Sequence, residues 1–370
     1  MSYQSVDALQ NALANTTFAR TQAPKKAAGR ALGTLVELIT FYMIRDWGLE
    51  QDTAIERGLP EYGNCEITHN VEYTLHGSKR IRTAAFPNDG KTVTTNAIAK
   101  RILNLNLGSA ELSKSRALLR GTTLRHACNL AEGDDNFWNA MGLSDTHFAV
   151  NELSKVPYAM FECKRVGIEE GQKKGPQTIE KAKQGAYVAR TVSGLQRVPR
   201  RDGSVAAIVE DANGQLVTHD DYYTFLQKAI RNQDRTALAN VVLTIGIVSN
   251  HGNWFTADDH NKEMRVLAQS YDWLLFLTDA ALAEFIETVL QGTDPSFAAT
   301  RAAFELSHSG TAKSTTFTKV TIDAGADREL TDYFARTDPW ADWFNVISPD
   351  LSIGSLKDEL HLLSDLYRRP

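Results

Sequence analysis

The chain has 370 residues, 42% of them hydrophobic, which is enough for one large domain or two ordinary ones. No apolar run approaches the length of about 18 residues typical of a transmembrane helix, and the N-terminus lacks the apolar core of a signal peptide. Three widely spaced cysteines, Cys65, Cys128 and Cys163, suit neither a disulfide framework nor a zinc site. We therefore expect a reduced, cytoplasmic protein that does not associate with a membrane.

The net charge is −5, but basic residues concentrate in two segments. Residues 164–201 contain ten Lys and Arg against three acids, and residues 76–125 contain ten against two. Basic segments on an acidic body are typical of a protein with one phosphate-binding face. The ordinary alternative is that both are solvated helix faces, and the position of one segment directly after a candidate metal site favours phosphate binding.

The first 125 residues predict a helical start followed by a hairpin. An apolar helix is expected over residues 33–47, with Glu37 in its first turns. Residues 65–86 predict a hairpin that turns near Gly77, and residues 92–125 predict helices rich in basic residues. Phosphate contacts provide most sequence-independent affinity for DNA, and three basic residues of the hairpin could straddle a DNA backbone: Lys79, Arg80 and Arg82.

The most informative stretch is Phe161-Glu162-Cys163-Lys164. Side chains alternate along a strand, so Glu162 and Lys164 share one face while Phe161 and Cys163 point into apolar packing on the other. A carboxylate and an ammonium group side by side in an apolar strand can hold a divalent metal ion and a phosphate together. This stretch is the predicted chemical centre of the chain.

A second carboxylate is predicted from a hairpin just upstream. Residues 143–150 alternate like a strand, residues 151–157 form a polar, proline-ended reversal, and the chain then leads into Glu162. A slip of one residue in this hairpin brings Asp145 beside Glu162, within the roughly 4.5–5.5 Å that separates antiparallel neighbours. Asp134 and Asp135 are rivals for this role, but they lie in a loop and need a longer path.

The chain after Lys164 predicts a basic helix and then further strands and helices. Pro176 suits the first position of a helix over residues 177–192. A hairpin over residues 205–218 and a helix over residues 220–231 follow. Residues 241–248 and 273–277 predict strands buried on both faces, with helices between and after them, as an α/β core requires. We expect five basic residues near this helix to bind phosphate: Arg165, Lys173, Lys174, Lys181 and Lys183.

Asp145 followed by Glu162-Cys163-Lys164 resembles the signature of the PD-(D/E)xK nucleases, as found in type II restriction endonucleases, with Ser144 where that family often has Pro. The resemblance implies an α/β fold in which a central mixed sheet is flanked by helices, with a restriction-endonuclease-like core and helical additions. It implies that Asp145, Glu162 and the carbonyl of Cys163 bind Mg²⁺. Lys164 would then assist catalysis, with Glu37 and Gln184 as auxiliary residues.

Both auxiliary residues have alternatives. Glu37 matches in order the glutamate that family members often carry on the first core helix, but a helix-surface carboxylate near the positive end of the dipole fits equally. Gln184 resembles a helix glutamine of some relatives, although Tyr187 follows it three residues later instead of four. His251 and His260 flank a loop and could touch DNA, but a loop histidine is usually just solvated.

The predicted function is that of a type II restriction enzyme, a Mg²⁺-dependent, sequence-specific endonuclease acting on double-stranded DNA. The resemblance further implies a homodimer, a separate cognate DNA methyltransferase, and a prokaryotic cytoplasmic location. Alternatives are a repair or recombination nuclease of the same fold, or a DNA-binding protein that lost catalysis. We expect residues 1–290 to form the catalytic core and residues 291–370 an extension for packing or dimerisation.

Overall fold

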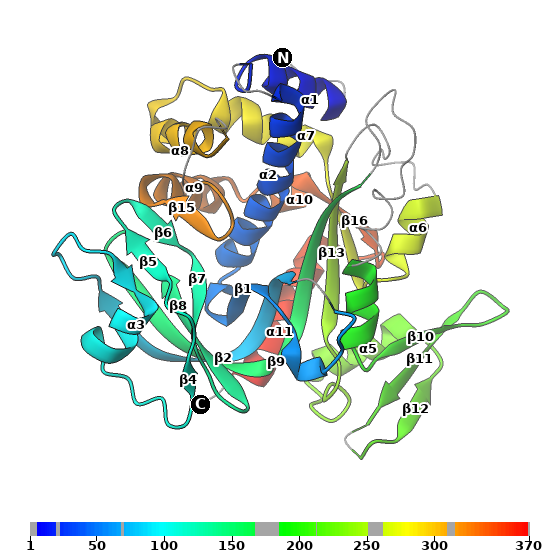
Figure 1. The fold of residues 1–370 in the computed structure, drawn as a ribbon. Helices are drawn as coiled ribbons and strands as arrows, with labels where there is room; N and C mark the ends of the chain where they lie inside the picture. The colour runs from blue at the N-terminus through cyan, green and yellow to red at the C-terminus, as the bar shows by residue number, and fades with distance from the viewer. Residues whose placement is uncertain are drawn as a thin grey trace.

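The computed structural model describes residues 6–19, 23–67, 70–166, 185–211, 213–250, 262–308 and 315–368 (Figure 1). They form a mixed α/β protein around a nine-stranded mixed sheet flanked by helices. This agrees with the fold class expected from the alternation of strand and helix patterns.

The longest strand, β9 (His147–Val166), organises the central sheet. One of its edges pairs antiparallel with β2 (Val71–Ala85) along most of its length. The other edge pairs first with the antiparallel strand β8 (Asn136–Gly142) and then with the parallel strand β13 (Leu243–Asn250). The strand therefore belongs to both halves of the sheet, and it runs from one side of the molecule to the other (Figure 1).

The remaining strands extend the central sheet or form two small ones. In the central sheet they are β1 (Thr53–Arg57), β4 (Glu111–Leu112), β7 (Ala127–Glu132), β14 (Trp273–Leu277) and β16 (Phe344–Ser348). A three-stranded sheet, which projects from the lower right of the molecule in Figure 1, contains β10 (Gln196–Pro199), β11 (Val205–Glu210) and β12 (Leu216–His219). A four-stranded sheet contains β3 (Val93–Thr94), β5 (Ala117–Arg120), β6 (Thr123–Arg125) and β15 (Thr321–Asp323).

Helices pack around these sheets. The α-helices are α1 (Val6–Asn15), α2 (Pro24–Asp46), α3 (Thr95–Ala97), α5 (Tyr222–Arg231), α6 (Lys262–Ala268), α7 (Asp279–Phe285), α8 (Ala298–His308), α9 (Ala324–Thr337), α10 (Trp340–Trp343) and α11 (Ile353–Tyr367). The shorter helical turns are η1 (Glu50–Asp52), η2 (Pro60–Tyr62), η3 (Ile98–Ile102), η4 (Ile286–Leu290) and η5 (Pro295–Phe297). Residues 185–192 are also helical.

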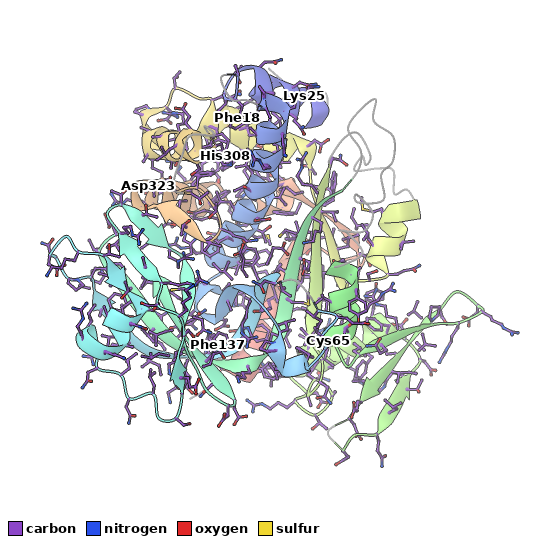
Figure 2. The ribbon with its side chains drawn as sticks, in the orientation of Figure 1. Phe18, Lys25, Cys65, Phe137, His308 and Asp323 are labelled. Carbon is purple, nitrogen blue, oxygen red and sulfur yellow. The ribbon has the colours of Figure 1, made fainter. Side chains whose placement is uncertain are left out.

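Helix α2 is the central helix of the core. It starts with Pro24 at its first positions, where the missing N–H costs no hydrogen bond, and it buries most of its length. By length and composition alone it could span a membrane, but 72% of its most apolar window is buried inside the protein. The N-terminal helices join the C-terminal ones where Phe18 packs against Phe304 and His308 (Figure 2).

The alternation of β9 determines what each face of the sheet packs against. Phe161 and Cys163 join the cluster formed with α2, and the Cys163 Sγ lies 3.5 Å from Thr40 Oγ1. Met160, on the opposite face, packs with Ala186, Ala189 and other residues of the helix at 185–192. The strand therefore lies between two helical layers, and Glu162 projects toward the second one.

Several predicted elements are confirmed. The helix over 33–47 falls within α2, the hairpin over 205–218 is β11 and β12, and the helix over 220–231 is α5. The buried strands at 241–248 and 273–277 are β13 and β14.

Both hairpins predicted around the site are wrong. Residues 71–85 form the single strand β2, and Gly77 lies within this strand instead of at a turn. A glycine suits this position because a side chain there would collide with the Tyr367 carbonyl at the end of α11. Residues 147–166 likewise form one strand. Pro157 is accommodated because it lies at an irregularity in the pairing with β2 and between the segments that pair with β8 and β13.

Two other regions differ from expectation. Residues 92–125 were predicted as helices but contain β3, β4, β5 and β6 with only short helical turns, because their apolar residues pack into the four-stranded sheet and its neighbour. Residues after 290 are integrated with the rest of the chain: β16 extends the central sheet beside β14, and β15 pairs with β6.

Candidate active site on strands β2 and β9

Glu162 and Lys164 lie on one face of β9, as their spacing predicts. The Lys164 Nζ is 3.0 Å from Glu162 Oε2. The Glu162 side chain is completely buried, whereas 22% of the Lys164 side chain is exposed. The pair is therefore an interior ion pair whose cation reaches the surface.

The second carboxylate of this site is Glu72, which the sequence reasoning did not single out. Tyr73 pairs with Phe161, and this antiparallel register places Glu72 opposite Glu162. The Lys164 Nζ is 3.0 Å from Glu72 Oε1 as well, and the Cys163 N–H donates a hydrogen bond to Glu72 Oε2 at 3.4 Å. Two carboxylates from adjacent strands therefore share one lysine.

A signal for Glu72 was present in the sequence. In Val71-Glu72-Tyr73-Thr74-Leu75 a single carboxylate interrupts a run of strand-forming residues, which is the same pattern that identified Glu162. The predicted turn near Gly77 concealed it, because it made this segment the first arm of a short hairpin instead of a neighbour of β9.

Asp145 does not belong to this site, so its predicted place beside Glu162 is wrong. It precedes β9 and lies at the opposite end of that strand from Glu162. Its Oδ2 accepts a hydrogen bond of 2.8 Å from Arg328 Nη2 in an exposed ion pair. The physical reason is the absent hairpin: a strand that does not reverse carries Asp145 away from Glu162.

The two carboxylates perturb each other's titration. Burial raises the pKa of Glu72 to about 8, and the hydrogen bond and charge of Glu162 contribute to the same shift. Burial lowers the pKa of Lys164, but the charges of Glu162 and Glu72 outweigh it, so its pKa rises and the lysine stays protonated. Lys164 therefore compensates one negative charge, and a proton on Glu72 compensates the other until the pH approaches its raised pKa.

A second lysine lies next to this cluster. The Lys319 Nζ is 2.9 Å from Glu37 Oε2 on α2 and 3.5 Å from Glu56 Oε1 on β1, and its side chain is only 5% exposed. Its charge also acts on Glu72. Glu37 is therefore linked to the cluster through Lys319, and it lies in the middle of α2 instead of at the positive end of the helix dipole.

Lys319 comes from the C-terminal part of the chain, to which the sequence assigned no chemistry. Thr318-Lys319-Val320 lies in a Thr-rich loop before β15, and nothing local in that loop distinguishes the lysine. Its backbone carbonyl lies 2.9 Å from the Nδ1 of the buried His126, whose Nε2 lies 3.1 Å from Asp327 Oδ1. These contacts hold the loop against the core.

The other predicted residues have different outcomes. Lys79, Arg80 and Arg82 are exposed on the second half of β2, away from Glu72. Arg165 is half-buried and donates hydrogen bonds to the carbonyls of Gly29 at 2.8 Å and Asn250 at 3.2 Å, so its guanidinium joins β9 to α2 and β13. Several residues lie outside the described part of the chain: Lys173, Lys174, Lys181, Lys183, Gln184, His251 and His260.

Two residues of the cluster, Glu72 and Glu162, could act as carboxylate ligands of a metal ion. Within the described residues no three His, Cys, Asp or Glu side chains converge as a ready-made metal site. Mg²⁺ is usually held by one or two carboxylates and keeps several waters, and Glu72 with Glu162 provides two carboxylates. The peptide of Cys163 faces Glu72 through its N–H, which places backbone atoms of that residue at the same point.

Comparisons with protein-family models, with curated proteins and with solved structures each gave no match.

Proposed function

We propose that this protein is a metal-dependent nuclease that hydrolyses phosphodiester bonds of double-stranded DNA. The observation that carries the proposal is the meeting of Glu72, Glu162 and Lys164, in which two buried carboxylates from adjacent strands converge on one lysine Nζ at 3.0 Å from each. Lys164 compensates one negative charge, and Glu72 keeps a proton near neutral pH because its pKa is raised to about 8. A bound Mg²⁺ would displace that proton and leave two carboxylates facing the ion.

Each residue of the cluster has a distinct part in this reaction. Glu72 and Glu162 would hold Mg²⁺, with the carbonyl of Cys163 as a further ligand, and the ion would supply an activated water and neutralise charge on the phosphate. Lys164 remains protonated, since both glutamates raise its pKa, so it cannot act as the base. It instead donates hydrogen bonds to the attacking water or to a phosphate oxygen and stabilises the transition state electrostatically.

The order of elements supports the finer assignment to a restriction-endonuclease-like core. Helix α2 is followed by β1, β2 and β9 as antiparallel neighbours, and β13 then returns parallel to β9 after the helix at 185–192. Glu72 takes the position that the sequence assigned to Asp145. Glu37, near the cluster through Lys319, remains an auxiliary candidate.

Within this class we propose a type II restriction enzyme that works in a prokaryotic cytoplasm beside a separate DNA methyltransferase. Cutting both strands of a duplex needs two active sites, which a homodimer provides. The exposed Lys79, Arg80 and Arg82 would contact the DNA backbone outside the cleavage site. A repair nuclease or a binding protein without catalysis are the alternatives that the experiment separates.

The test is to incubate the purified chain with phage DNA and Mg²⁺. Discrete fragments support a site-specific enzyme, a smear supports a repair-like nuclease, and uncut DNA that is shifted on a gel supports a binding protein. Lys164→Ala should slow cleavage by at least about 100-fold and leave DNA binding nearly unchanged. Lys155→Ala is the matched control, because Lys155 is on the same strand but outside the cluster. Equal cleavage by Lys164→Ala and the parent protein would refute the site.

A further inference from the structure

A pocket of about 510 Å³ lies at β1, the strand that pairs with β2. Residues 54–58 of β1 and the loop after it form one wall, and residues of β6 and β7 form the other. Glu56 lines the pocket and pairs with Lys319, and Val320 lines it too. Ile55 pairs with Tyr73 of β2, and this register places Glu56 opposite Glu72. The pocket is therefore linked to the cluster through the pairing of β1 with β2 and through the contact of Glu56 with Lys319.

Two arginines, on the wall of the pocket opposite β1, give this wall a positive charge. Arg116 and Arg125 both line it, and the Arg125 Nε donates a hydrogen bond to the Ala117 carbonyl at 3.2 Å. Neither guanidinium forms an ion pair with a carboxylate among the residues that the structure describes. Arg57, the third arginine of the pocket, differs: it pairs with Glu61 at 2.7 Å and lies over the ring of Phe137.

The two arginines are close enough to repel each other. Burial lowers the pKa of Arg125, the neighbouring Cys128 and Glu56 raise it, and the charge of Arg116 lowers it. Both also act on the buried thiol of Cys128, another residue of the pocket wall. The two arginines repel each other at one wall of the pocket, while the other wall carries the carboxylate of Glu56. An anion bound at the two guanidinium groups would relieve their repulsion. The guanidinium fork suits the oxygens of a phosphate.

We propose that Arg116 and Arg125 bind a phosphate group of the DNA strand that runs from the scissile position into this pocket. The inference rests on the proposed function and adds a substrate-positioning subsite to it. Anchoring a neighbouring phosphate fixes the register of the strand over Glu72 and Glu162. Both arginines are positioning residues, so their loss should weaken binding and raise KM while kcat stays the same.

The primary test is Arg116→Ala, since Arg116 is exposed and its replacement does not threaten folding. Fluorescence anisotropy with a labelled duplex in EDTA should show roughly tenfold weaker binding. The slope of log affinity against log salt should fall by about 1 in magnitude, as expected for one lost phosphate contact. Arg125→Ala should give the same slope change once its melting temperature shows that it is folded.

Arg120→Ala is the matched control, because Arg120 is exposed on the same small sheet but does not line the pocket. It should leave affinity and salt slope unchanged. An equal loss in Arg120→Ala would mean a diffuse basic surface and would overturn the subsite. Unchanged affinity and KM in Arg116→Ala, in a parent protein that cuts DNA, would overturn the subsite and leave the nuclease assignment intact.

Calorimetry with inorganic phosphate and with adenosine monophosphate separates DNA from free phosphate esters as the source of the ligand. Weak binding of phosphate that is lost in Arg116→Ala, by a parent protein that also binds DNA, supports the subsite. If the protein binds adenosine monophosphate but no DNA, the ligand of the two arginines is a free nucleotide, and the proposal that they bind a DNA phosphate is overturned. A parent protein that binds DNA and cuts none would refute the nuclease function alone.

Discussion

An acidic group with a basic partner lies near each end of β9, and the two groups differ in burial. At one end, Glu162 is fully buried and shares Lys164 with Glu72. At the other end, Asp145 is exposed and pairs with Arg328, which is exposed too. An exposed pair is screened by solvent and contributes roughly 0–1 kcal/mol. In the buried group two acids share one lysine, and the pKa of Glu72 is raised to about 8 because the interior disfavours a second negative charge beside Glu162.

Strand pairing explains why two carboxyl groups come together at only one end of β9. Glu72 faces Glu162 because β2 and β9 run antiparallel with Tyr73 opposite Phe161. Near its first residues β9 pairs with Ala84 and Ala85 of β2, which offer no carboxylate. The composition of the partner strand, more than that of β9 itself, therefore determines where an active site can form.

The largest expected effect separates the two ends directly. Glu72→Gln removes one of the two carboxylates and should reduce cleavage by at least about 100-fold, as the loss of a metal-binding group does. Asp145→Asn should cut within about twofold of the parent protein and lower its free energy of unfolding by less than about 1 kcal/mol. Both are measured as initial rates on plasmid DNA, with stability from urea unfolding. A strong loss in Asp145→Asn with normal Glu72→Gln would restore the sequence-based site.

The sequence predicted the relation of Glu162 to Lys164 in the candidate site but not the place of Glu72. Glu162 and Lys164 are two residues apart on one strand, so their relation is local and the period of a strand reveals it. Glu72 meets them only through the register of β2 against β9. Short polar or proline-containing segments normally reverse a chain, and here residues 151–157 are held extended by partners on both edges. The pairing partners of residues 151–157 lie far from them in the sequence, so the segment's own residues do not reveal that it is extended.

The next prediction concerns the pH dependence of Mg²⁺ binding at Glu72 and Glu162. Burial and Glu162 raise the pKa of Glu72 to about 8 from its ordinary value of 4.5. Below pH 8 the metal-free protein therefore keeps a proton on Glu72 that Mg²⁺ must displace. The apparent affinity for Mg²⁺ should rise about tenfold per pH unit up to about pH 8 and then level off. Calorimetry in two buffers of different ionisation enthalpy should detect one proton released per ion, and an affinity independent of pH from 6 to 8 would contradict this.

The raised pKa of Glu72 also determines whether the stability of the metal-free protein rises or falls with pH. Between about pH 4.5 and 8 the folded protein holds a proton on Glu72 that the unfolded chain has lost, so metal-free stability should fall as pH rises through this window. Glu72→Gln cannot titrate and should lack this part of the slope. Melting temperatures of the two proteins in EDTA, taken between pH 5 and 9, measure the difference.

Lys319 shows a second limit of sequence reasoning. A lysine in a Thr-rich loop has no distinguishing pattern, and its place beside Glu37 and Glu56 depends on contacts that hold residues 318–320 against His126. By contrast, the fold class followed from strand and helix periods along the chain, because each buried strand such as β13 carries its own continuous apolar run. A residue pattern within one strand or helix can therefore be recognised in the sequence, whereas contacts between residues far apart in the sequence cannot.

The smallest expected effect tests whether Lys319 acts on the buried end of β9. Its positive charge lowers the pKa of Glu72, opposing burial and Glu162. Lys319→Met should therefore raise the pKa of Glu72 further, move the pH dependence of Mg²⁺ binding to higher pH, and weaken binding a fewfold at pH 7. Lys319→Arg keeps the charge and should restore the position of the curve. A role confined to packing would lower the melting temperature of Lys319→Met without moving the pH curve, and that outcome would separate Lys319 from the chemistry of Glu72.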